Sequence, residues 1–347
     1  MTLSIGYLAG YWGSRPPQGV AEVFAAADGL GLDSLWTSES YGSDAFTPLA
    51  WWGAATSRAR LGTAVAQISA RTPTATAMAA MTLDHLSRGR FVLGLGVSGP
   101  QVVEGWYGQR FDRPLERTRE YVEIIRRVLR REGPLTFEGR QFTLPLPTPQ
   151  AKALRANLRP LRADLPIHLA AQGPKNTALA AEIADGWLPA FFSPRLDDEY
   201  RRHLGEGFAK RPDGTRPATE FEVNVSLPVA VGRDVEDAAR LLAPHVALYV
   251  GGMGSVETNF HRAVLERLGH EAACERIAAA WQAGDRDAAA ASVPTELVLD
   301  VALAGRPDQL ADQARRFEGT VATGLLIQTD PRTLPLVVEA LTSGPTR

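Results

Sequence analysis

Glycines crowd the loop that follows one apolar run, where they would let a ligand approach the backbone closely. Gly94, Gly96 and Gly99 and the hydroxyl of Ser98 lie in or just after the run 91–96. Glycine permits close approach to the backbone, and loops that follow buried strands often carry function. The glycine spacing also matches a dinucleotide-binding pattern, but the acidic residue expected to end a second strand about 20 positions later is missing. The loop therefore predicts ligand binding and argues against a two-half nucleotide-binding sheet.

A second segment places groups that suit a phosphate at the start of a predicted helix. Residues 170–177 read Ala-Ala-Gln-Gly-Pro-Lys-Asn-Thr. Free N–H groups and the positive end of the helix dipole attract an anion there, and Lys175 adds a positive charge. A cap formed by Asn176 or Thr177, with Lys175 in solvent, explains the same residues equally well. The residues alone leave both interpretations open.

Two carboxylates follow predicted strands and are candidates for proton chemistry. Glu39 follows the second predicted strand and is flanked by aromatic residues, and Glu104 lies close to Trp106. A carboxylate in such a place can act as a general acid, contact a cofactor or cap the next helix. The sequence does not choose among these roles.

Metal, thiol and serine-hydrolase chemistry find no support. The six histidines lack the spacing of metal ligands, so we predict no metal site. Cys274 is the only cysteine, and its helical surroundings favour a packed thiol over a nucleophile. No GxSxG motif is present.

Composition narrows the choice of partners. The chain has 347 residues, a formal net charge of -2 and no basic run, which makes nucleic acid an unsuitable partner. The first residues lack a signal-peptide pattern, and no later stretch approaches 18 uninterrupted apolar residues. We therefore expect a cytoplasmic protein that has no membrane partner and acts on a small molecule.

These groups need a scaffold that brings the ends of many strands together. Short apolar runs alternate with helix-period stretches, which is typical of a parallel sheet covered by helices. The predicted strands span 4–8, 33–36, 60–66, 91–96, 166–171, 185–189, 221–231 and 324–328. Eight strands, each followed by helical sequence, predict an α/β fold of the (β/α)8 TIM-barrel type, in which the carboxyl ends of the strands form one mouth.

Two insertions interrupt the predicted single domain, which spans 1–347. The first, about 133–164, contains a hairpin pattern around a Glu-Gly turn. The second, about 252–292, contains a long helical region over 255–291. Neither insertion separates the strands into two halves, so one barrel remains the prediction.

Several segments resemble the bacterial-luciferase-like family, and within it the coenzyme F-420-dependent branch that includes methylenetetrahydromethanopterin reductase. They occur in the family's order along the whole chain, at 31–41, 61–65, 71–77, 83–96, 170–175 and 181–188. The most specific parts are 84–96 and the Gln-Gly-Pro-Lys turn at 172–175. The resemblance implies a luciferase-like barrel that holds a flavin-like ring at its mouth.

The resemblance also assigns cofactor positions residue by residue. Thr63, Ala64 and Val65 correspond to a bulge under the central ring, with a non-proline cis peptide expected between Ala64 and Val65. Arg71 is available to the acidic tail of the coenzyme. The segments that hold the ribityl chain and phosphate correspond to Gly96, Val97 and Ser98 and to Gln172, Gly173, Pro174, Lys175, Asn176 and Thr177.

Catalytic and substrate positions follow from the same comparison. Glu39 corresponds to the family's usual aspartate, and Ser40 stands where many members have histidine, which predicts a different substrate. The catalytic candidates are Glu39, Ser40 and Glu104, and the substrate-binding candidates are Tyr7, Trp12, Trp187 and Phe191. Packing in the core is the alternative role for Trp12, Trp187 and Phe191.

The implied reaction is hydride transfer between the deazaflavin coenzyme F-420 and a small organic substrate. An FMN-dependent monooxygenase is the alternative, because the same barrel serves both cofactors, and a non-catalytic flavin-binding protein is a second alternative. The resemblance also implies a homodimer that pairs through helices of the first half of the barrel, where Trp51 and Trp52 lie.

Overall fold

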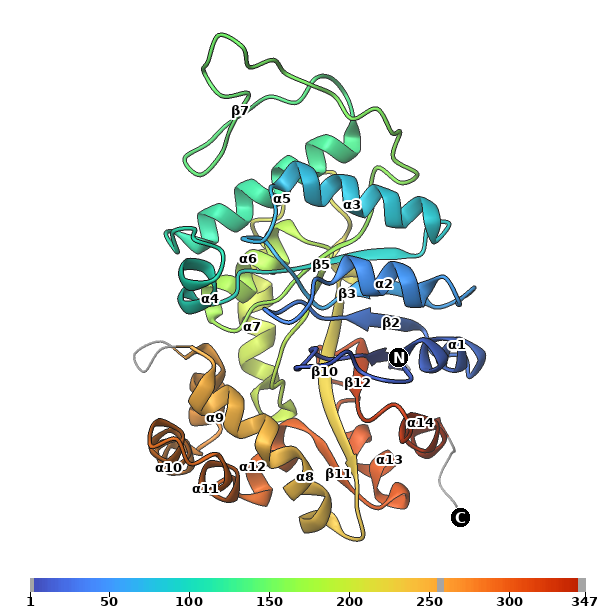
Figure 1. Cartoon of the computed structure of the whole chain (residues 1–347), viewed down its shortest axis with the longest axis vertical. Coiled ribbons are helices and arrows are strands. Elements are labelled where there is room, and N and C mark those ends of the chain that lie inside the picture. Colours follow the sequence, from blue (N-terminus) through green and yellow to red (C-terminus); the bar gives the residue numbers. More distant parts are fainter. Residues whose placement is uncertain (1–2, 255–258, 343–347) are drawn as a thin grey trace.

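A closed ring of parallel strands forms the centre of the computed structural model, which describes residues 3–254 and 259–342 (Figure 1). Around the ring the strands are β1 (Ser4–Leu8), β2 (Ser34–Thr37), β3 (Arg60–Thr63), β5 (Phe91–Gly96), β8 (Ile167–Leu169), β9 (Gly186–Trp187), β10 (Glu222–Val231) and β12 (Gly324–Gln328). β12 pairs with β1 and closes the ring. The predicted (β/α)8 barrel is confirmed.

Helices surround the barrel and form a group of their own after β10 (Figure 1). In the first half they are α1 (Val20–Gly29), α2 (Phe46–Gly53), α3 (Pro73–Leu86), α4 (Pro100–Gly105), α5 (Pro114–Arg130), α6 (Pro174–Ile183) and α7 (Asp197–Phe208). In the second half they are α8 (Val235–Ala247), the π-helical turn η3 (Leu248–Gly252), α9 (Phe260–Arg267), α10 (Glu271–Gln282), α11 (Arg286–Ala291), α12 (Thr295–Val301), α13 (Pro307–Arg315) and α14 (Leu334–Thr342). None of the described helices combines the length and the apolar character that a membrane crossing needs.

The second half differs from the sequence prediction in two places. The predicted helical region 255–291 is divided, over its described part, into α9, α10 and α11. Gly269 and Gly284 follow the ends of α9 and α10 with φ of 92° and 82°, a conformation that favours glycine. The short strand β11 (Leu303–Gly305), which pairs with the far end of β10, was not predicted. Its three residues are too few to show an alternating pattern.

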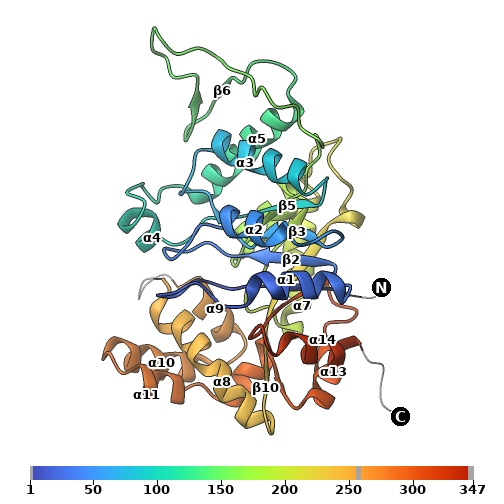
Figure 2. The ribbon, with the colours of Figure 1, turned by 45° about the vertical axis from the view of Figure 1, so that its right-hand side comes forward.

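The first predicted insertion lies between α5 and β8 and projects from the barrel beside α3 and α5 (Figures 1 and 2). It contains a small hairpin of β6 (Phe137–Glu138) and β7 (Thr143–Leu144). The carboxylate of Glu120 on α5 accepts hydrogen bonds from three successive backbone N–H groups of the hairpin, at 2.8, 2.9 and 3.0 Å. Glu120 therefore ties the hairpin to the barrel's helical layer.

Apolar side chains fill the barrel below its mouth. A Cβ atom on Gly62 would lie 2.2 Å from the ring of Trp36, so only glycine lets this ring lie across the barrel. A Cβ atom on Gly94 would lie 1.8 Å from the carbonyl oxygen of Thr63, so glycine is also needed where β5 meets β3. The residues of this interior cluster, which we call the floor, are Leu8, Trp36, Val92, Leu188 and Leu326.

The polar side chains of His168, Glu222 and Arg60 lie near the ring of Trp36. The ring centroid of His168 is 6.0 Å from that of Trp36, and its Nε2 is 3.8 Å from a carboxylate oxygen of Glu222. Arg60 forms an ion pair with Glu222 at 2.9 Å. His168 is fully buried, and among the described residues neither of its ring nitrogens has a hydrogen-bond partner. Burial lowers the pKa of His168 to about 4, although the charge of Glu222 opposes this effect.

We predict that His168 makes the fold sensitive to acid. The unfolded chain takes up a proton at this residue near about pH 6.5, whereas the folded chain does so only near its lowered pKa, so stability falls as the pH drops through this window. Between about pH 7 and about pH 5, the free energy of unfolding should fall by about 2 kcal/mol less in His168→Asn than in the unchanged protein. Urea unfolding at both pH values measures this loss. An equal loss in the variant and the unchanged protein would contradict the prediction.

Candidate active site at the barrel mouth

The turn between β3 and β4 (Ala66–Gln67) lies over the floor. The Ala64–Val65 peptide bond is cis, as expected from the resemblance. The backbone N–H of Ala64 donates to Thr37 at 2.7 Å, and its carbonyl accepts from the Ser38 hydroxyl at 3.1 Å. Ala64 and Val65 are half-buried and pack against the floor. The turn thus presents a small apolar surface at the carboxyl ends of the strands.

Thr63 has a different position from its two neighbours. Its side chain is fully buried, and its hydroxyl donates to the carbonyl of Gly94 at 2.7 Å and accepts from the N–H of the same residue at 3.0 Å. Thr63 therefore joins β3 to β5. Its side chain supports the turn from below, whereas Ala64 and Val65 form the upper surface.

The glycine loop after β5 packs directly on this turn. A Cβ atom on Gly96 would lie 2.4 Å from a methyl carbon of Val65, so a larger residue would displace the turn. Val97 and Ser98 follow and are half-buried, and Ser98 has a φ of 58°. The structure thus brings the predicted segments 63–65 and 96–98 together.

The start of α6 resolves an ambiguity that the sequence left open. Gly173 is the N-cap residue, and no side chain caps the helix, so neither Asn176 nor Thr177 has that role. Gln172 and Asn176 are half-buried, Pro174 and Lys175 are exposed, and Thr177 is buried. Among the described residues, the backbone N–H groups of Gly173 and Lys175 have no hydrogen-bond acceptor. This open helix start can receive an anion.

Glu39 forms a buried ion pair with Arg71. The two guanidinium nitrogens of Arg71 lie 2.9 and 2.8 Å from the two carboxylate oxygens of Glu39, and the backbone N–H of Gln67 donates to Glu39 at 2.7 Å. Burial lowers the pKa of Arg71, but the hydrogen bond and charge of Glu39 outweigh burial and raise it. Arg71 is thus engaged by Glu39, which disfavours the expected contact between Arg71 and an acidic coenzyme tail.

The other two catalytic candidates lie in separate loops. Ser40 is half-buried, and its backbone N–H donates to Ser43 at 3.3 Å. Glu104 is exposed on α4 and accepts the backbone N–H of Phe111 at 3.1 Å. Among the described residues, no hydrogen bond joins Glu39, Ser40 and Glu104. The structure does not bring them together as one acid–base group.

The aromatic substrate candidates divide into two pairs. Tyr7 packs edge-on against Phe24 of α1, and Trp187 packs against Tyr200 of α7, so both lie between the barrel and its helices. Trp12 follows β1, is half-buried and stacks on the ring of Trp52 at 5.9 Å. Phe191 follows β9 and is buried among other rings. Only Trp12 and Phe191 lie in loops at the mouth.

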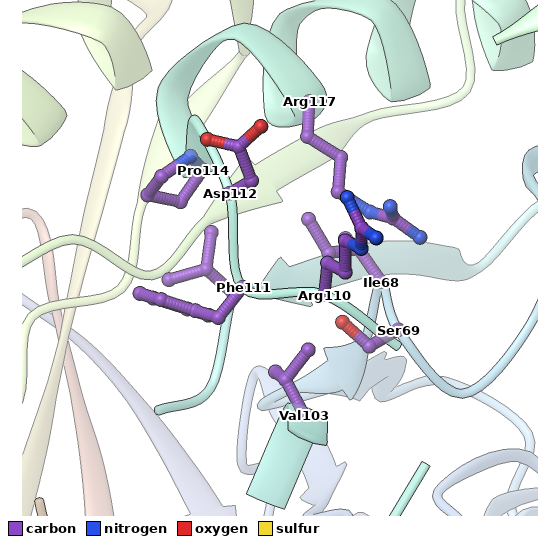
Figure 3. A pocket seen from close by; sticks show the side chains of 9 residues that line it. Ile68, Ser69, Val103, Arg110, Phe111, Asp112, Pro114 and Arg117 are labelled. Atoms are coloured by element: carbon purple, nitrogen blue, oxygen red, sulfur yellow. The ribbon is translucent and has the colours of Figure 1, made fainter. Parts of the chain in front are cut away.

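Sequence reasoning missed two arginines beside the predicted loop 96–98. Figure 3 shows the small pocket that they line, with Val97 among its other lining residues. Among the described residues, neither Arg110 nor Arg117 forms an ion pair, and the buried Nε of Arg117 has no hydrogen-bond partner. Burial lowers the pKa of Arg117, with Tyr121 opposing it. No spacing rule distinguishes these two from the chain's many other arginines.

Comparisons with known proteins identify relatives over nearly the whole chain. The family model described as luciferase-like monooxygenase matches residues 6–324. A putative coenzyme F-420-dependent oxidoreductase of Mycobacterium tuberculosis is 51% identical over 329 residues, 94% of each chain. The 5,10-methylenetetrahydromethanopterin reductase of Archaeoglobus fulgidus is 29% identical over 289 residues, 83% of this chain and 82% of the relative.

Two solved structures share the fold. The coenzyme F-420-dependent tetrahydromethanopterin reductase of Methanopyrus kandleri superposes with a TM-score of 0.82 at 23% identity, over 98% of this chain and 99% of that one. The FMN complex of the oxygenating component of 3,6-diketocamphane monooxygenase from Pseudomonas putida superposes with a TM-score of 0.67 at 17% identity, over 100% and 99%. Because the family model covers most of the barrel and the nearly full-length relative is half identical, the chain belongs to the luciferase-like monooxygenase family.

Proposed function

We propose that this chain is a coenzyme F-420-dependent oxidoreductase that transfers a hydride between the deazaflavin and a small organic substrate. The observation that carries the proposal is the arrangement at the mouth, where the apolar turn at Ala64 and Val65 lies in the same rim as the open start of α6. A flat ring suits the first surface and a phosphate suits the second. The choice of a deazaflavin is supported by the name of the half-identical relative.

The residues present fit such a coenzyme. Ala64 and Val65 would lie under the ring, supported by the floor. The N–H groups of Gly173 and Lys175 would receive the phosphate, and Lys175 would add positive charge. Arg110 and Arg117 form no ion pair within the described residues, line the pocket beside Val97, and would hold further acidic groups. The bound coenzyme would supply the two-electron step, while these side chains bind and orient it.

An FMN-dependent monooxygenase is the second candidate, favoured by the structural likeness to the FMN complex from Pseudomonas putida. Titration of the purified protein with coenzyme F-420 and with FMN separates the two. We expect tighter binding of coenzyme F-420 and slow oxygen consumption by the reduced complex. Tight FMN binding with no measurable coenzyme F-420 binding and rapid oxygen consumption would replace the proposal. Binding of either cofactor without turnover of any substrate would favour a non-catalytic flavin-binding protein.

We also propose a homodimer that pairs through α2. Trp52 is buried against Trp12 and Phe24, whereas Trp51 on the same helix is 79% exposed. A tryptophan exposed to this extent is typical of an interface. Trp51→Glu should shift the protein from dimer to monomer in sedimentation velocity at micromolar concentration. Leu241→Glu, at an exposed apolar residue of α8, is the matched control and should leave the dimer intact. A monomeric unchanged protein would refute the dimer.

A further inference from the structure

Three rings from the helices after β10 pack with a fourth ring from the loop after β9, beside the mouth. Phe191 comes from the loop after β9, His245 from α8, Tyr249 from η3 and His261 from α9. The ring centroids of Tyr249 lie 5.0 Å from Phe191, 4.8 Å from His245 and 4.8 Å from His261. The cluster therefore joins the helices that follow β10 to a loop of the barrel mouth.

A hydrogen bond leads from this cluster to a more exposed side chain. The hydroxyl of Tyr249 donates to the hydroxyl oxygen of Tyr11 at 3.3 Å. Tyr249 is 8% exposed, whereas Tyr11, in the loop after β1, is 41% exposed. Because Tyr249 supplies the hydrogen of this bond, the O–H of Tyr11 remains available, and among the described residues it has no acceptor.

The cluster can form hydrogen bonds but carries no charge at neutral pH. Burial lowers the pKa of both His245 and His261 to about 4, and for His261 the neighbouring His245 lowers it further. Burial raises the pKa of Tyr249. Burial of the hydroxyl end of Tyr11, whose residue as a whole is 41% exposed, raises the pKa of Tyr11, so both hydroxyls stay protonated. The buried Nδ1 of His261 has no hydrogen-bond partner among the described residues. An ionised ligand group placed here would lose hydration without gaining an opposite charge.

The neighbouring part of the rim is also aromatic. Tyr41, in the loop after β2, is 60% exposed, and Trp106, at the end of α4, is 64% exposed. Their ring centroids lie 6.4 Å apart. With Tyr11, three rings from loops at the carboxyl ends of different strands are open to solvent, which suits a bulky apolar ligand.

We propose that Tyr11 donates a hydrogen bond to the carbonyl or hydroxyl oxygen of an uncharged, largely apolar substrate, and that Tyr249 is a positioning residue for Tyr11. The inference rests on the proposed function and names its substrate class. Ketones and alcohols fit this class, and carboxylates and phosphate esters do not. The hydroxyl of Tyr249 donates to the Tyr11 oxygen and so fixes its position. The rings of Phe191, His245 and His261 pack around Tyr249 and fix its own position.

The test compares matched ligands on the full chain, with and without oxidised coenzyme F-420. One series holds aryl and aliphatic ketones such as acetophenone, and the other holds counterparts in which a carboxylate replaces the acyl group, such as benzoate. Binding is followed by ligand-observed NMR. We expect the ketones to bind at least about tenfold more tightly than the carboxylates, because the described residues of this cluster include no cation.

Three substitutions, each of which removes one tyrosine hydroxyl, test the roles of these residues in ketone binding. Tyr11→Phe should weaken ketone binding about tenfold, the effect of one hydrogen bond. Tyr249→Phe keeps the packed ring, so a role in packing alone predicts no change, whereas the proposed role predicts several-fold weaker binding. Tyr200→Phe is the control, because Tyr200 lies on α7 against Trp187 and away from the mouth, and it should leave ketone binding unchanged. Coenzyme affinity should be the same in all three variants.

Each adverse outcome has a separate meaning. Equal or tighter binding of the carboxylates, an unchanged ketone affinity in Tyr11→Phe, or no binding of either series would overturn the inference. Failure of the protein to bind coenzyme F-420 would instead overturn the proposed function. In that case ketone binding to the coenzyme-free protein still decides whether Tyr11 and Tyr249 form a site.

Discussion

Arg162→Met should destabilise the folded chain by about 3–5 kcal/mol, because it leaves a buried carboxylate without its cation. The side chain of Asp84 is 1% exposed, and the Arg162 Nε lies 3.2 and 3.1 Å from its two oxygens. A second nitrogen of Arg162 donates to Asp84 and to the carbonyl of Phe91, the latter at 2.6 Å. Urea unfolding followed by circular dichroism measures the loss.

Two variants separate the ion pair from a general effect of removing an arginine. Arg155 is exposed in the same insertion and has no hydrogen bond or ion pair among the described residues, so Arg155→Met should change stability by less than about 0.5 kcal/mol. The double variant Asp84→Leu/Arg162→Met should recover much of the loss, because it removes both buried charges. A loss in Arg162→Met no larger than that in Arg155→Met would show that the pair does not stabilise the fold.

This ion pair explains why the segment 84–96 is so specific in the sequence although it contains no catalytic candidate. Asp84 anchors the first insertion, Arg90 donates to the backbone of Ser87 and Thr56 at 2.9 and 3.1 Å, and Gly94 permits the contact of β5 with β3. The resemblance to the family is therefore carried in part by residues that build the barrel. The spacing of these barrel-building residues therefore predicted the fold and gave no information on the reaction.

The sequence could in principle have predicted which strand side chains point into the barrel and which point toward the helices. Gly6 and Gly186 lie where the barrel interior is crowded, because a Cβ on either would approach Ser34 or His168 within about 3 Å. Neighbouring residues on a strand point to opposite faces, so Tyr7 and Trp187 must point toward the helices. Assigning both to the substrate site neglected this alternation.

Other relations depend on the tertiary fold and have no local signal. Glu39 and Arg71 are 32 residues apart, and Tyr11 and Tyr249 are 238 apart. A single sequence shows which of these side chains follow strands, but it does not show which will be neighbours. The segments 63–65, 96–98 and 172–177 could be proposed because each is contiguous and follows one strand, whereas the histidine and tyrosine cluster also needs Phe191 from a loop more than 50 residues away.

Gly173→Asp should weaken coenzyme binding about 100-fold, because it places a negative charge where the proposed phosphate binds. The backbone at Gly173 has φ of -94° and ψ of 159°, which any residue adopts, and a Cβ atom there would have no neighbour within 4 Å. The variant should therefore fold. Aspartate is also a favourable N-cap, so α6 and the coenzyme-free protein should become more stable, by a few tenths of a kcal/mol up to about 1 kcal/mol.

A higher stability together with a lower coenzyme affinity would distinguish the effect of the charge from damage to the fold, since a damaged fold would lower both. Gly173→Asn is the matched control, because asparagine caps a helix equally well and has nearly the same size without the charge. It should stabilise the protein to a similar extent and weaken coenzyme binding less than about tenfold. Fluorescence titration gives the affinities and thermal unfolding gives the stabilities. If Gly173→Asp and Gly173→Asn bind the coenzyme equally well, the phosphate lies away from the start of α6, and Arg110 and Arg117 become the next side chains to replace.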